Sequence, residues 1–147
     1  MREILFRGKR VGSEEWVEGF YLTSPEFDNQ EVAVITTDKP RNPYYVSKET
    51  IGQYTGLTDK NGKKIFEGDI VHLTDVRYEN EWKAVVVFGN PYCQYSWGWN
   101  FKHIGKKPQI NTDILLWVEM EDIQVYCEII GNITDNPELL KERDNNE

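Results

Sequence analysis

Cysteines and long apolar runs are scarce in this sequence. Its two cysteines, Cys93 and Cys127, are too few and too far apart to predict a disulfide scaffold or a Cys-x-x-Cys pair. We therefore expect free thiols in a reducing cytoplasm. No stretch approaches the roughly 20 apolar residues of a membrane helix, and the N-terminal apolar run, Ile4 to Phe6, is too short for a secretory signal. These absences predict a cytoplasmic protein with no membrane partner.

Histidine is equally scarce, which limits metal binding and catalysis. Neither His72 nor His103 has a cysteine or a second histidine at ligand spacing, so we expect no metal. No serine lies in a G-x-S-x-G elbow, and neither cysteine has a local catalytic signature. The sequence therefore predicts no catalytic residue, no metal and no cofactor. An enzyme of another class stays open only through His72, which Asp69 or Asp75 could orient.

Basic residues are outnumbered by acidic ones. The chain has 17 lysines and arginines against 25 aspartates and glutamates, which gives a formal charge of -8. Domains that bind nucleic acid usually carry the opposite sign, so bulk binding to nucleic acid is disfavoured. A concentrated acidic face that mimics DNA is a minor alternative, because moderate net charge also serves solubility.

The dominant pattern in the sequence is a series of short runs in which apolar and polar residues alternate. They are separated by Gly, Asn, Asp and Pro, which is typical of β-strands. Aromatic residues make up 13% of the chain, and chains that remain disordered are poor in them. The predicted strands are Glu3 to Arg7, Glu15 to Leu22, Glu31 to Thr37, Tyr44 to Val46, Ile51 to Leu57, Asp69 to Val76, Trp82 to Phe88, Tyr95 to Phe101, Ile114 to Val118 and Val125 to Ile130.

These strands predict an all-β fold, mainly antiparallel, made of two closely packed small β sub-domains. The composition changes around residues 56 to 68, so we place an N-terminal sub-domain at residues 1–60 and a C-terminal one at residues 61–147. Five short strands in the second predict a small barrel, and its EGDIV stretch resembles the opening of SH3-like barrels. Near the C-terminus, Asn136 can cap a short helix of about two turns that begins at Pro137.

The stretch LTDKNGKKIFEGD, residues 57 to 69, contains two turn signals. A calcium loop needs oxygen ligands at its first and twelfth positions, but with Gly62 at position six these are Leu57 and Gly68. The spacing of its glycines also differs from that of a phosphate-binding P-loop. We therefore expect a structural turn in which Asn61 and Gly62 take positive φ, followed by a second turn at Gly68.

One predicted strand has an entirely aromatic face and is followed by basic residues. In a functional interpretation, the aromatic side chains stack on the bases of a single-stranded nucleic acid and the lysines hold phosphates. In the other interpretation, the aromatic face is the core face of the barrel and the basic stretch is a solvated loop, since apolar strand faces are normally buried. The candidate nucleic-acid or partner contacts are Tyr95, Trp97, Trp99, Lys102, His103, Lys106 and Lys107.

Three blocks of the sequence are distinctive: REILFRGK with the following WVEGF, the central TIGQYTGLTDKNGKKIFEGDIV, and the C-terminal IIGNITDNPELL. In these blocks the chain resembles the YopX-like proteins of phages and prophages of Gram-positive bacteria. The resemblance implies a mostly β architecture, assembly into oligomers and no catalytic residue, and the stretch from Trp82 to Val118 matches no motif of the family. We therefore expect a non-catalytic accessory protein in a bacterial host cell, acting through self-assembly or through contact with a phage or host protein.

Overall fold

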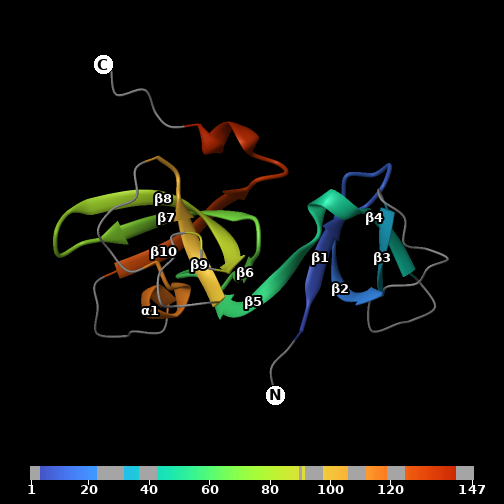
Figure 1. The fold of residues 1–147 in the computed structure, drawn as a ribbon, viewed down its shortest axis with the longest axis horizontal. Coiled ribbons are helices and arrows are strands. Elements are labelled where there is room, and N and C mark those ends of the chain that lie inside the picture. The colour runs from blue at the N-terminus through green and yellow to red at the C-terminus, as the bar shows by residue number, and fades with distance from the viewer. Residues whose placement is uncertain are drawn as a thin grey trace. The chain divides into compact units, whose positions relative to one another are not determined.

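The computed structural model describes residues 4–22, 32–36, 43–89, 91, 98–105, 112–118 and 125–141. Over these residues the chain is built mainly from antiparallel β-strands, and the predicted all-β fold is confirmed (Figure 1). The chain divides into two compact units, Met1–Gly56 (unit 1) and Leu57–Glu147 (unit 2), whereas the sequence placed a division after residue 60. No helix in the described part is long and apolar enough to cross a membrane.

Unit 1 is an antiparallel meander whose first and fourth strands meet. Its elements are β1 (Phe6–Lys9), β2 (Trp16–Leu22), β3 (Val32–Thr36), β4 (Pro43–Ser47), the 3-10 turn η1 (Lys48–Thr50) and β5 (Gly52–Thr58), whose end belongs to unit 2. The sheet order is β4-β3-β2-β1-β5-β6, so β5 returns to pair with the start of β1 and its own end pairs with β6 (Lys64–Phe66). Beyond β1, Arg10 forms a bridge with Val46, and the Val11 N–H donates to the Tyr45 carbonyl at 3.0 Å. The meander therefore closes on itself.

The closed meander surrounds a small core. Ala33, Ile35 and Val46 have no exposed surface, and side chains from β1, β2 and Ile51 pack around them. Gly8 faces this core from β1, where an added Cβ atom would lie 2.8 Å from Val46 Cγ2. A side chain at Gly8 therefore requires the core to shift, which gives a physical reason for the glycine of the REILFRGK block.

Unit 2 contains a four-stranded antiparallel sheet and several short elements. These elements are β6 (Lys64–Phe66), β7 (Asp69–Asp75), β8 (Asn80–Gly89), β9 (Gly98–His103), α1 (Ile114–Val118), β10 (Val125–Asn132) and the 3-10 turn η2 (Pro137–Leu140). The four strands lie in the order β10-β7-β8-β9, and a β-bulge in β10 lies between Ile129 and Gly131. This order places β10 and β9 at opposite edges, so the small SH3-like barrel that the sequence predicts here stays a prediction.

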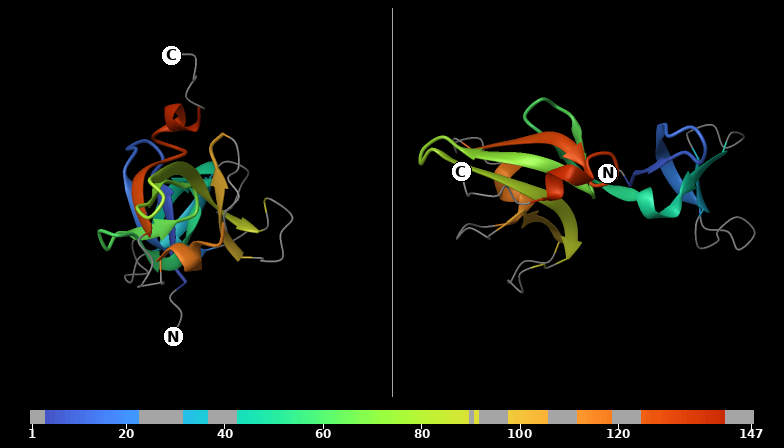
Figure 2. Two further views of the ribbon diagram at one scale, coloured as in Figure 1. Left: turned by 90° about the vertical axis from the view of Figure 1, so that its left-hand side faces the viewer. Right: turned by 90° about the horizontal axis from the view of Figure 1, so that it is seen from above.

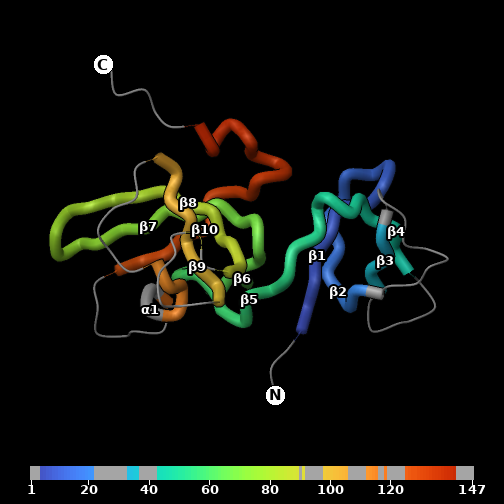
Figure 3. Tube along the Cα trace, in the orientation of Figure 1, coloured from blue at the N-terminus to red at the C-terminus, as the bar shows by residue number. Residues whose placement is uncertain are grey.

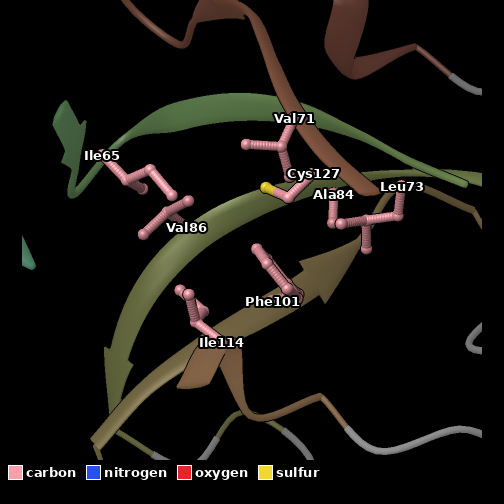
Figure 4. Packing of buried hydrophobic residues seen from close by; sticks show 8 residues of the cluster. All are labelled: Ile65, Val71, Leu73, Ala84, Val86, Phe101, Ile114 and Cys127. Carbon is pink, nitrogen blue, oxygen red and sulfur yellow. The ribbon is translucent and has the colours of Figure 1, made fainter. Parts of the chain in front are cut away.

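One face of this sheet carries the core of unit 2 (Figure 4). Alternation along β7 and β8 places Val71, Leu73, Ala84 and Val86 on this face, and Phe101 of β9 joins them. The cluster is completed by Ile65, Ile114 and Cys127. Because these side chains are almost fully buried, truncation of the largest, Phe101→Ala, is expected to cost about 3–5 kcal/mol.

The segment Ile114–Val118 is helical, and its prediction as a strand is wrong. The Leu115 N–H donates to Asp113 Oδ1 at 3.0 Å, so the aspartate caps the first turn as an N-cap residue does. A five-residue apolar run fits both a buried strand and a buried helical turn, and its periodicity alone does not separate them.

The C-terminal helix is a single 3-10 turn, Pro137–Leu140, and is shorter than the two turns predicted. Asn136 precedes it without a side-chain capping bond to it, because its Oδ1 accepts from the Asn132 N–H at 3.2 Å. The same side chain fills the space beside Gly131, where an added Cβ would collide with it. The amide of Asn136 therefore holds the turn that follows β10.

Candidate functional site

The turn between β5 and β6 has one residue with positive φ, at Gly62. The Gly62 N–H donates to the Asp59 carbonyl at 3.0 Å, and the Asp59 N–H donates to the Lys63 carbonyl at 2.8 Å. Gly62 has a φ of 77°, but Asn61 is not among the described non-glycine residues with positive φ, so that part of the prediction is wrong. The pattern is that of a three-residue hairpin loop, in which a type I turn is followed by one left-handed residue.

The Asp59 carboxylate organises this loop. It is buried, and its Oδ1 accepts the N–H groups of Asn61 and Lys63, each at 2.9 Å. Its Oδ2 accepts the Ile129 N–H at 3.0 Å, across 70 residues of sequence. The Asp59 carboxylate is therefore committed to backbone donors.

The loop formed by residues 59–63 also covers the outer edge of β10. Figure 3 traces the chain through both segments. Besides the bond to Ile129, the Lys60 N–H donates to the Cys127 carbonyl at 3.0 Å. Lys60 Nζ lies 3.4 Å from Glu128 Oε2, which adds an ion pair at the same edge. An exposed strand edge invites pairing with another chain, and this loop removes that option for the middle of β10.

The second turn, at Gly68, connects two of the distinctive sequence blocks. Gly68 has a φ of 89°, and its N–H donates to the Val86 carbonyl at 2.9 Å. Its carbonyl accepts from the Ile133 N–H at 2.9 Å, which ties the central block to the C-terminal one. Both glycines of the stretch LTDKNGKKIFEGD, Gly62 and Gly68, thus take backbone conformations that the turns require.

A hollow of about 320 Å³ lies beside the loop 59–63. Its lining residues are Thr58, Asp59, Lys60, Val118, Val125, Tyr126 and Cys127. Burial, reinforced by the negative charges of Asp59 and Asp69, raises the pKa of the Cys127 thiol to about 12. Cys127 is therefore a neutral thiol at physiological pH and a poor nucleophile. Since the charged groups of the wall are already paired, the hollow offers no reactive centre.

The aromatic strand lies partly within the described residues. Phe101 is in the core, and His103 is 6% exposed with its ring edge-on to Trp82 at 6.5 Å. His103 was predicted as a surface contact, but its burial places it on the core face. Lys102 points to the opposite, exposed side of β9. The remaining predicted contacts, Tyr95, Trp97, Lys106 and Lys107, lie outside the described residues.

The predicted contact Trp99 has an exposed aromatic neighbour that the sequence did not single out. Phe88 is its cross-strand partner in the β8–β9 ladder, and the two ring centroids are 5.0 Å apart at 69°. Phe88 is 60% exposed although it continues the core face of β8, while Trp99 packs against the core cluster. The apolar face of the hairpin thus extends beyond the edge of the core. The alternation of residues in the sequence alone does not reveal where the core ends.

Asn100 holds the end of this hairpin together. It is buried, and its Nδ2 donates to the Gly89 carbonyl at 2.7 Å and to the Gly98 carbonyl at 3.3 Å. Its Oδ1 accepts from Thr112 Oγ1 at 3.2 Å, and the Phe101 N–H donates to the Thr112 carbonyl at 2.8 Å. The edge of β9 is therefore covered as well, and Asn100 positions the strand ends beside the Phe88–Trp99 pair.

Titratable groups elsewhere in unit 2 are arranged as ion pairs. His72 Nε2 lies 3.7 Å from Glu81 Oε1 on the face opposite the core. Hydrogen bonds from the Arg77 side chain hold the pKa of Asp75 below its usual value. Within the described ranges, no group of three His, Cys, Asp or Glu side chains could hold a metal ion.

Comparison with known proteins identifies the family. The family model described as YopX protein matches residues 5–141. The chain belongs to the YopX family. No curated protein matches it. Among solved structures, the YopX chain is similar to the crystal structure of protein EF1440 from Enterococcus faecalis, with 22% identity, a TM-score of 0.51, and coverage of 96% of this chain and 100% of that chain. At this identity the likeness shows the fold alone.

The three blocks that resemble the YopX family have structural roles in this chain. The first contributes β1 with Gly8 against the core, and the central one contributes the covering loop that Asp59 organises. The last contributes the end of β10, with Gly131 packed against Asn136. The YopX blocks thus account for the fold and leave the surface of the β8–β9 hairpin outside them.

Proposed function

We propose that this YopX protein is a non-catalytic accessory protein of a phage or prophage that acts through protein contacts, including contacts with further copies of itself. The observation that carries this proposal is the Phe88–Trp99 pair, in which a rigid strand presents a phenylalanine that is 60% exposed. Aromatic side chains are enriched at the centres of protein interfaces, where they bury large areas at low entropic cost.

The covered strand edges favour side-chain contacts over strand addition. Loop 59–63 occupies the edge of β10, and Thr112 occupies the edge of β9. Association through unit 2 therefore has to use side chains on its faces and hairpin ends.

The closed meander of unit 1 adds support for peptide or protein recognition. Four successive strands, a 3-10 turn and a fifth strand that returns to the first form the connectivity that we propose to be SH3-like. This assigns the SH3-like character to unit 1, while the sequence suggested it for unit 2. Small barrels of this kind include peptide-binding domains.

Light scattering coupled to size exclusion tests the proposal. We expect a mass that is a multiple of 17.3 kDa for the wild type, and a lower mass for Phe88→Ser. Leu115→Ser removes an apolar side chain of comparable exposure on α1 and serves as the control. A wild-type mass near 17.3 kDa at every concentration would contradict self-association, and equal masses for both variants would remove Phe88 from the contact.

Binding of single-stranded nucleic acid is the second candidate, and the exposed Phe88 ring is the observation that favours it. A base could stack on this ring beside Trp99, as bases stack on aromatic side chains in proteins that bind single strands. A gel shift at low salt with single-stranded oligonucleotides tests this candidate. A shift that Phe88→Ala abolishes supports it, whereas unchanged mobility of the wild type excludes it.

A further inference from the structure

The loop 59–63 contains Asn61, the one asparagine of the chain that a glycine follows. Figure 2 shows this loop in green from two further sides. Asn61 and Gly62 are both exposed, and a Cβ atom added at Gly62 would meet no atom of the described residues within 4 Å. A glycine has no side chain to keep its backbone nitrogen away from a neighbouring group. The pair therefore offers an unhindered approach of the Gly62 nitrogen to the Asn61 amide.

The Asn61 side chain is held loosely, in contrast to the side chain of Asn100. Asn61 Nδ2 donates to Glu128 Oε1 at 3.5 Å, which is the outer limit of a hydrogen bond. The buried Asn100 donates to the Gly89 carbonyl at 2.7 Å and accepts from Thr112 Oγ1 at 3.2 Å. Rotation of the side chain toward the next backbone nitrogen therefore costs little at Asn61 and breaks short bonds at Asn100.

The closed loop restrains the other reacting group, the backbone nitrogen of Gly62. Its N–H donates to the Asp59 carbonyl at 3.0 Å. The N–H groups on either side, of Asn61 and Lys63, donate to Asp59 Oδ1 at 2.9 Å. A nitrogen held in this way neither loses its proton nor turns toward the side chain before it. Reaction at Asn61 therefore requires the loop to open locally.

We propose that Asn61 is a site of spontaneous deamidation, and that the opening of loop 59–63 controls its rate. In the open loop the Gly62 nitrogen loses its proton and attacks Asn61 Cγ, so that a new C–N bond closes a succinimide ring. The bond from Cγ to Nδ2 breaks, and Nδ2 leaves as ammonia with the proton that Gly62 gave up. Water then adds to either carbonyl of the ring and opens it to aspartate or isoaspartate. No electron is transferred in these steps.

Either product disturbs the cover over the edge of β10. A carboxylate at position 61 lies near that of Glu128, whose Oε1 accepts from the amide before the reaction, and the two like charges repel each other. Isoaspartate also adds a carbon to the main chain between Asp59 and Lys63, which changes the spacing of the bonds that close the loop. Asp59 then no longer holds the Ile129 N–H, and the edge becomes open to pairing with another strand.

Peptide mass spectrometry of the full chain, incubated at mildly alkaline pH, tests the site. We expect aspartate and isoaspartate to accumulate at position 61 while Asn100 keeps its amide. Deamidation should be slower in the folded chain than in guanidinium chloride. The two rates should differ by about the factor by which folding slows hydrogen exchange of the Gly62 N–H, since both reactions need the same opening. An Asn61 amide that survives longer than this factor allows would overturn the proposal.

The variant Asp59→Ala tests the control that the loop exerts. We expect it to deamidate about tenfold or more faster than the wild type in the folded state, because three backbone N–H groups lose their acceptor. Circular dichroism establishes that the variant is folded, and if it is not, the comparison of deamidation with hydrogen exchange in the wild type decides. Equal rates in the folded variant and the wild type would show that the loop does not control the reaction.

Hydrogen exchange of the Ile129 N–H tests the consequence for β10. Asn61→Asp introduces the charge of one product, and Asn61→Ala removes the amide without adding a charge, so it is the matched control. We expect this N–H to exchange faster in Asn61→Asp than in Asn61→Ala, and fastest in wild-type protein that carries isoaspartate. Equal exchange in all three would show that the edge stays covered. None of these measurements depends on the mass of the wild type in solution, so they are independent of the proposed function.

Discussion

Two hairpin turns of unit 2 start in the same way and end differently. Asp59 accepts the N–H of Asn61, and Asp75 accepts the N–H of Arg77, so each turn begins with an aspartate bonded two residues ahead. In the first turn the left-handed position is Gly62, whereas in the second it is Glu79. The first turn folds back over β10, and the second projects from the unit.

The difference between these turns separates geometry from side-chain use. In the first turn the chain only changes direction, and Gly62 avoids the steric cost that a Cβ atom has in the left-handed conformation. Where it keeps glutamate in the same backbone conformation, it accepts strain for a carboxylate at an exposed site. The covering loop therefore belongs to the fold, whereas the turn between β7 and β8 exposes its side chains, Val76 and Tyr78 among them.

The largest expected effect is the loss of the covering loop in Asp59→Ala. Three backbone N–H groups lose their acceptor, and unsatisfied buried donors cost about 1–3 kcal/mol each when water does not replace the bond. We expect the free energy of unfolding to fall by about 3 kcal/mol in urea denaturation. Asp75→Ala is the matched control and should cost less, because the bonds of Asp75 stay within its own turn. Equal losses for the two variants would erase the distinction between the turns.

The left-handed positions should respond to substitution with opposite signs. Gly62→Ala places a Cβ in a strained conformation and should lower the free energy of unfolding by about 1 kcal/mol. Glu79→Gly relieves the same strain and should raise it by a similar amount, less the added entropy of the unfolded glycine. Thermal unfolding of both variants checks the signs. A destabilised Glu79→Gly would mean that its side chain supports the fold.

The thiol beneath the covering loop predicts a loss of stability in alkaline solution. The folded pKa of Cys127 is about 12, against an ordinary value of 9.0, so the folded protein holds the proton more tightly than the unfolded chain. Its stabilising contribution is full below pH 9.0 and declines between pH 9.0 and about 12, by about 1.4 kcal/mol per pH unit. Urea denaturation of Cys127→Ala in a Cys93→Ser background should show a flatter decline than Cys93→Ser alone. If stability declined equally steeply with pH in both proteins, burial would not raise the pKa of the Cys127 thiol.

The smallest expected effect is in acid, at the Asp75–Arg77 pair of the turn between β7 and β8. Arg77 lowers the pKa of Asp75, so the carboxylate stabilises the fold above the pKa of the unfolded chain. That contribution is lost as pH falls through the lower folded pKa. Because the Arg77 side chain is exposed, the change in stability should be small. A side-chain NMR titration should show the Asp75 pKa rising in Arg77→Ala. An unchanged pKa would contradict the claim that Arg77 lowers it.

The strands and the turns were predictable from sequence because their signals are local. Alternation along β7 and β8 and the Asn-Gly pair after Asp59 act within a few residues. The task of the covering loop was not predictable, since it depends on a bond from Ile129 to Asp59 across 70 residues. The sequence analysis predicted positive φ for both Asn61 and Gly62, but a three-residue loop places only Gly62 there.

The candidate site was less accessible to sequence analysis than the fold. Alternation placed Trp99 and Phe101 on one face and left His103 in the basic stretch after the strand, but it does not report how far along the strand the core extends. Burial removes His103 from the surface, while the cross-strand partner Phe88 is exposed. The strain at Glu79 left no trace in the sequence pattern, because it is a property of backbone conformation.

The mass of Phe88→Ser in light scattering, measured beside the wild type, tests the central claim most directly. We predict a wild-type mass that is a multiple of 17.3 kDa, and a Phe88→Ser protein that has a lower mass at the same concentration. A Phe88→Ser protein that keeps the full wild-type mass would contradict the claim that the exposed Phe88 ring serves association.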